Sequence, residues 1–79
     1  MPVLLRVGSF MFQFWASDRH EPPDIHVRSG RRKAKFWLVP QVRLARNQGF
    51  KPHELTVLRA LTIEHSKFFV EKWHEFFNH

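Results

Sequence analysis

The sequence predicts an α+β domain, in which a small antiparallel sheet of three or four strands precedes one long helix or two consecutive C-terminal helices packed on one face of the sheet. Two patterns predict this class: hydrophobic residues alternate with polar ones in the first half of the chain and recur at three-to-four spacing in the second. A length of 79 residues suits one domain. We therefore expect a single domain over residues 1–79, with a strand meander at about 3–46 and a helical segment at about 51–78.

The strands are predicted from alternation along the chain. In segment 10–16, every second residue from Phe10 onward shares one face. Segment 24–28 places Ile25 and Val27 inward, and it places Asp24, His26 and Arg28 on the opposite face. After a hairpin turn at 29–31, segment 33–39 alternates in the same way, and a fourth, edge-like strand is expected at 42–46 before a turn at 47–49.

The helical segment begins near Pro52, which suits a first helical turn. Its apolar positions form one stripe that should cover the inner face of the sheet: Leu55, Leu58, Leu61, Thr62, His65, Phe69, Trp73 and Phe76. Ser66 could act as an N-cap, so the pattern leaves open whether there is one helix or two.

The charge balance points to an anionic partner. Thirteen Lys and Arg residues against seven Asp and Glu residues give a net charge of +6, which favours a polyanion or an acidic protein. The absence of cysteine excludes disulfides, thiolate zinc sites and a cysteine nucleophile. No apolar run approaches the length of a membrane span, so we expect a cytoplasmic protein without membrane contact.

Reactive side chains are densest in segment 18–28, which contains His20, Asp24, His26 and Arg28 around a Pro-Pro pair. Histidine can take up and release a proton near neutral pH. One histidine could remove the proton of a ribose 2′-hydroxyl while the other protonates the leaving oxygen, with Arg28 neutralising the phosphate and Asp24 orienting an imidazole. This interpretation is metal-independent RNA cleavage, which requires no cofactor.

Two other interpretations of the same segment stay open. His20, Asp24 and His26 could bind a divalent metal, because imidazole and carboxylate are suitable ligands. Alternatively, the segment is a solvated loop followed by the polar face of a strand, without chemistry of its own.

A second candidate site is basic. Cationic residues gather on the predicted hairpin and the strand after it, where Trp37 shares a face with some of them: Arg31, Arg32, Lys33, Lys35, Arg43 and Arg46. Phosphate neutralisation beside an aromatic ring is typical of single-stranded RNA binding. The same charges could instead dock an acidic protein.

The stretch from His20 to Val27, which reads His-Glu-Pro-Pro-Asp-Ile-His-Val, resembles the bacterial family called domain of unknown function forty-one sixty. Gly30, Ala34, His65 and Trp73 extend the resemblance along the chain. Members of the family carry a histidine where this chain has Asp24.

The resemblance implies a component of a toxin–antitoxin-type pair, here the toxin half. With the residues above, it leads us to expect a toxin that acts on RNA as an endoribonuclease and binds a cognate antitoxin-like protein. The alternative is a non-catalytic basic module that docks an acidic antitoxin or nucleic acid. A homodimer is a further expectation, since an edge strand needs covering.

Overall fold

The computed structural model describes residues 3–77, without the side chain of Asp18. Five strands come first, interrupted once by a short 3-10 helix, and two α-helices follow. In chain order the elements are β1 (Val3–Val7), β2 (Phe10–Gln13), η1 (Ala16–Asp18), β3 (Asp24–Ser29), β4 (Arg32–Trp37), β5 (Arg43–Gln48), α1 (Pro52–Glu64) and α2 (Ser66–Phe77). The predicted α+β class is confirmed.

The five strands form one antiparallel meander in the order β1-β2-β3-β4-β5. The prediction of three or four strands thus falls one or two short, because β1 begins with three consecutive apolar residues and shows no clean alternation. The last strand also extends beyond its predicted end. Asn47 and Gln48 belong to β5, and the turn follows at Gly49, whose φ of 95° favours glycine.

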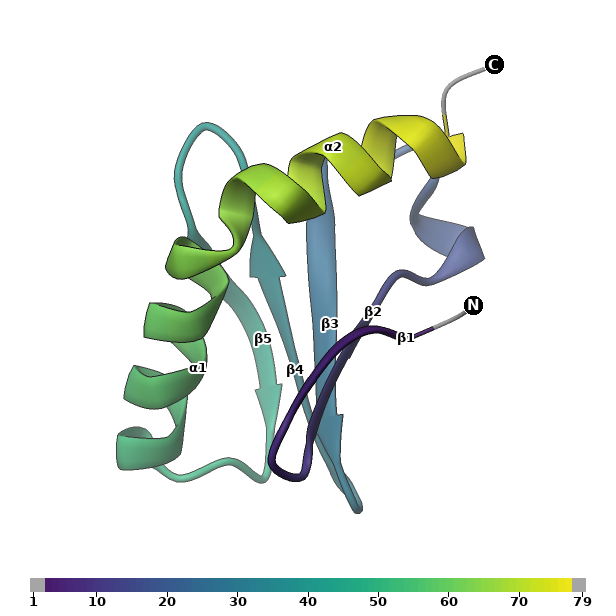
Figure 1. Cartoon of the computed structure of the whole chain (residues 1–79). Helices are drawn as coiled ribbons and strands as arrows, with labels where there is room; N and C mark the ends of the chain where they lie inside the picture. The colour runs from purple at the N-terminus through teal and green to yellow at the C-terminus, as the bar shows by residue number, and fades with distance from the viewer. Residues whose placement is uncertain (1–2, 78–79) are drawn as a thin grey trace.

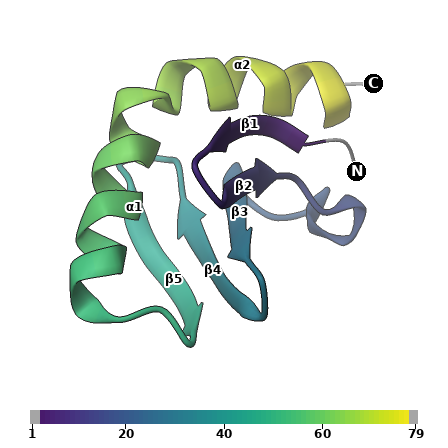
Figure 2. The ribbon, with the colours of Figure 1, turned by 60° about the horizontal axis from the view of Figure 1, so that its bottom comes forward.

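Both helices lie on one face of the sheet, with α2 crossing above the strands and α1 standing beside β5 (Figures 1 and 2). The predicted aromatic stripe supplies the contact. Phe69 stacks on Phe12 with ring centroids 5.6 Å apart, and Trp73 meets Phe14 edge to face at 5.4 Å. All four side chains are buried, so aromatic packing between α2 and the N-terminal half of the sheet forms the centre of the core.

The helical segment is two helices. α1 ends at Glu64, His65 takes a non-helical conformation, and α2 begins at Ser66. The Nδ1 atom of His65 lies 2.9 Å from the carbonyl oxygen of Leu61, so this histidine serves the helix junction. The junction lies at the opposite end of the molecule from segment 16–20 (Figures 1 and 2), which keeps His65 away from the loop that carries His20. None of the helices within residues 3–77 has the length and hydrophobicity that a membrane crossing requires.

Candidate nucleic-acid interface

The face of the sheet turned away from the helices carries most of the predicted site residues; we call it the outer face. Strand pairing arranges it in rows that run across the strands. One row is Gln13, His26, Lys35 and Arg46; the next is Arg6, Met11, Arg28, Lys33 and Gln48; the third is Asp24, Trp37 and Arg43. The predicted division of β3 and β4 into an inner and an outer face is confirmed by the burial of Ile25, Val27, Ala34 and Phe36 in the core.

A β-bulge brings both arginines of β5 to the outer face. Arg43 and Arg46 are three residues apart, so strict alternation would send them to opposite faces. The register between β4 and β5 shifts between Lys35 and Phe36, so that Arg46 pairs with Lys35 while Leu44 pairs with Phe36. The extra residue lets Arg43 and Arg46 share the outer face.

His26 lies beneath an indole ring. Trp15 follows β2, and its ring stacks on the imidazole with centroids 3.9 Å apart and planes within 2° of parallel. Only 8% of His26 is exposed, whereas 36% of Trp15 is. One face of the indole therefore covers the histidine, and the ring presents exposed surface beside the cations of the outer face.

Charged groups surround the same histidine. The Nε2 atom of His26 lies 3.8 Å from Oδ1 of Asp24, a residue with no exposed surface. The ammonium group of Lys35 lies 3.6 Å from Oδ2 of Asp24 and 2.5 Å from Oε1 of Glu21, and it sits 4.4 Å above the ring of Trp37. Lys35 is therefore a buried, compensated cation, which limits its predicted role as a phosphate contact.

On the outer face, two cross-strand pairs bring like charges together: Arg28 stands opposite Lys33, and Lys35 stands opposite Arg46. Such pairs destabilise a sheet. Carboxylates compensate Lys35, but none of the ion pairs among the side chains that the structure describes includes Arg28, Lys33 or Arg46. An anionic ligand would relieve the repulsion that these cations create.

The two predicted catalytic histidines have different surroundings. His20 is exposed in the segment that precedes β3, while His26 is closed in by Trp15 and neighbours Asp24. Arg28, the predicted phosphate contact, is exposed on the outer face. Within the part of the chain that the structure describes, no three His, Asp or Glu side chains are grouped closely enough to hold a metal ion. The structure of this part of the chain therefore does not support metal binding by His20, Asp24 and His26.

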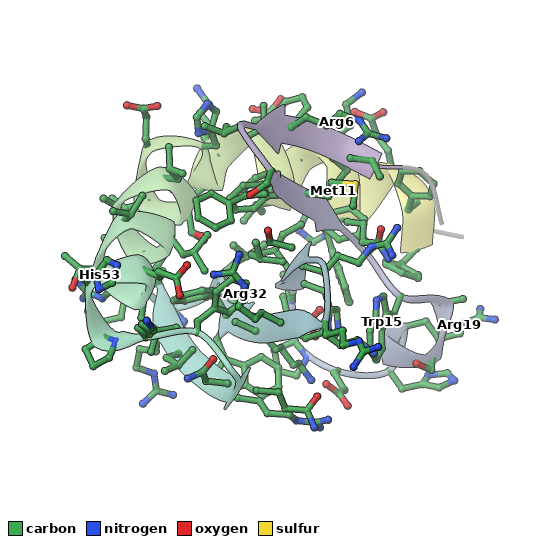
Figure 3. The ribbon with its side chains drawn as sticks, turned by 90° about the horizontal axis from the view of Figure 1, so that it is seen from below. Arg6, Met11, Trp15, Arg19, Arg32 and His53 are labelled. Carbon is green, nitrogen blue, oxygen red and sulfur yellow. The ribbon has the colours of Figure 1, made fainter. Side chains whose placement is uncertain are left out.

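Arg31 and Arg32, which were predicted to belong to the basic surface, do not lie on the outer face. Arg31 is exposed in the turn between β3 and β4. Arg32 points toward α1 (Figure 3), where it forms an ion pair with Glu54 and donates a hydrogen bond to Oγ of Ser29 at 3.1 Å. Alternation explains this placement, because Arg32 shares the inner face with Ala34. It links the hairpin to α1 and is therefore a structural residue.

Glu54 has a lowered pKa. The main cause is the hydrogen bond that its carboxylate accepts from the backbone N–H of Lys51, at 2.9 Å; Arg32 lowers the pKa further, while burial opposes both effects. This interaction stabilises the ionised carboxylate at the start of α1.

Two shallow hollows lie on the outer face. The β2–β3 hollow is lined by Gln13, Trp15, His26, Val27, Arg28 and Lys33. The β4–β5 hollow is lined by Trp15, His26, Lys33, Ala34, Lys35, Arg46 and Gln48. Each has room for about one water molecule, far less than the usual pocket for a drug-sized ligand.

The sequence reasoning missed Trp15, Gln13 and Gln48. Segment 10–16 was predicted as one strand, and strict alternation places Trp15 on the outer face with Gln13. Nothing local predicted the stacking of Trp15 on His26, because the two residues belong to different segments. Figure 3 shows Trp15 on the side of the sheet away from α1.

No curated protein and no solved structure gives a significant match to this chain. A family model does match it, over residues 9–74, which includes β2 to β5, all of α1 and most of α2. The model is described as "Domain of unknown function (DUF4160)". It covers the part of the outer face formed by β2 to β5, as well as the Pro-Pro segment. The chain belongs to this DUF4160 family.

Proposed function

We propose that this protein binds single-stranded RNA through the outer face of its sheet. The observation that carries the proposal is the uncompensated repulsion between Arg28 and Lys33, which stand opposite each other beside the exposed ring of Trp15. Cations that track a backbone and a ring that stacks bases together suit single-stranded nucleic acid.

Five exposed cations are available to phosphates on this face: Arg6, Arg28, Lys33, Arg43 and Arg46. If each neutralises one phosphate, the logarithm of the association constant should fall against the logarithm of salt concentration with a slope of about −3.5. The slope counts the charge contacts, so it separates a defined basic site from weak attraction by net charge.

The test is fluorescence anisotropy with a labelled 12-nucleotide RNA across a salt series. Lys33→Gln should weaken binding and reduce the slope by about 0.7. The matched control is Arg59→Gln, which removes an equal charge from the exposed surface of α1 and should leave the slope unchanged. Absence of binding at low salt, or equal effects of the two substitutions, would refute the proposal.

Cleavage of the bound RNA is a second candidate, favoured by one observation: the Asp24 carboxylate lies beside Nε2 of His26, where it could orient the ring. The same RNA incubated with the protein in EDTA should then acquire 2′,3′-cyclic phosphate ends. Cleavage that disappears in His20→Ala and in His26→Ala supports an endoribonuclease. RNA that is bound and left intact supports the binding module alone.

A further inference from the structure

We infer that single-stranded RNA crosses the strands of the sheet from one edge to the other, with Arg6 on β1 as a further binding residue. The inference rests on the proposed RNA binding, and it adds the path of the RNA, its length and a contact on a strand that the family model does not cover. The cations of the outer face and their acidic neighbours together determine this path.

One row of the outer face joins cations from three strands. Arg6 of β1 pairs with Met11 of β2, which in turn pairs with Arg28 of β3. Lys33 of β4 stands opposite Arg28. Arg46 of β5 is the diagonal neighbour of Lys33, and both line the β4–β5 hollow. These four cations are exposed, and the ion pairs among the described side chains include none of them.

The guanidinium group of Arg6 points along this row. Its Nη1 atom donates a hydrogen bond to the Sδ atom of Met11 at 3.0 Å, so the charge lies toward β2 and not beyond the edge of the sheet. Met11 separates Arg6 from Arg28 and has no charge of its own. Because a thioether sulfur is a weak acceptor, a phosphate oxygen can take its place. Arg6 is therefore directed toward the same phosphate chain as Arg28.

Two acidic side chains disfavour a path along the strands. Asp24 begins β3, four residues before Arg28, and Glu21 lies in the segment that precedes the strand. The side chain of Glu21 is 42% exposed. A phosphate chain that followed β3 away from the row would approach both carboxylates, whereas one that crosses the strands stays beside cations. Arg43 lies in the row of Asp24, about 13 Å along the strands from the row of Arg28, so RNA on this path does not reach it.

Trp15 lies beside this path. Its ring lines the β2–β3 hollow together with Arg28 and Lys33, so a base stacked on the exposed indole keeps its phosphates next to these cations. Arg6 and Arg46 lie on the two edge strands, four strand spacings or about 19 Å apart. A strand with stacked bases advances about 3.4 Å per nucleotide. The ligand is therefore an unpaired segment of about six nucleotides.

Two exposed arginines on opposite edge strands provide a matched pair of variants: Arg6 lies in the row, and Arg43 lies outside it. The assay is anisotropy with a labelled hexamer of adenylate across a salt series. Four contacts along the row correspond to a wild-type slope of about −2.8. Arg6→Gln should reduce this slope by about 0.7, as Lys33→Gln does, whereas Arg43→Gln should leave it unchanged.

A nitroxide label on either end of the hexamer reports the direction of the RNA independently of charge. One labelled end should broaden the amide signals of β1, and the other end should broaden those of β5. Labels that broaden opposite ends of the same strands would overturn the path, and so would slope changes that are equal in Arg6→Gln and Arg43→Gln or confined to Arg43→Gln. In each of these cases the proposed RNA binding stands. Absence of binding at low salt would overturn both proposals.

Discussion

Replacing Lys33 by glutamine should stabilise the fold while it weakens RNA binding. Lys33 stands directly opposite Arg28 on the outer face, and both side chains are exposed. Like charges in such a cross-strand pair cost about 0.2–1 kcal/mol. For a domain of this size, 1 kcal/mol corresponds to a shift in melting temperature of about 4–8 °C, so removal of the repulsion should raise the melting temperature by a few degrees.

The assay is thermal unfolding at low and high salt for wild type, Lys33→Gln, Arg28→Gln and the double variant. The gain should shrink in ~1 M salt, where the screening length falls to about 3 Å. In low salt the double variant should gain less than the sum of the single variants, because either substitution alone removes the pair. A Lys33→Gln variant that is destabilised at both salt concentrations, or strictly additive gains, would refute the reasoning.

Three further substitutions test other parts of the structure. Trp15→Ala should weaken RNA binding by about 1–3 kcal/mol, whereas Trp15→Phe should retain most of the affinity; equal losses in both variants would contradict stacking. Glu54 has a lowered pKa in the folded state, so its ionised form stabilises the fold above its ordinary pKa and this contribution disappears as pH falls through the folded-state pKa. Glu54→Gln should therefore destabilise the protein at neutral pH and match wild type in acid, as urea unfolding at both pH values would show. Phe69→Ala should cost about 3–5 kcal/mol in the same assay, because Phe69 is fully buried against Phe12; a loss below 1 kcal/mol would contradict its place in the core.

Local periodicity was enough to predict the α+β class and the two faces of β3 and β4. It worked there because Ile25 and Val27 alternate with polar neighbours and both strands lie inside the sheet. It could not predict that Arg43 and Arg46 share a face, since the bulge that joins them depends on how β4 and β5 pair. It missed β1 because Val3, Leu4 and Leu5 are consecutive apolar residues without alternation.

The candidate site was predicted in part. The predicted cations lie on the outer face, apart from Arg31 and Arg32. The stacking of Trp15 over His26, in contrast, depends on the path that residues 15–23 take across the sheet. The ion pair between Glu21 and Lys35 depends on the same path. Contacts of this kind join segments that have no common periodicity, so a single sequence contains no local signal for them.

The central claim is that RNA occupies the outer face, and a titration of isotope-labelled protein with a single-stranded RNA octamer, followed by NMR, tests it most directly. The account predicts that the backbone amide signals of β3, β4 and β5 shift together with the indole signal of Trp15, which Trp15→Phe would identify. Signals of the exposed residues of α1 should stay in place. Shifts confined to α1 and α2, or an unchanged spectrum at a large excess of RNA, would contradict it.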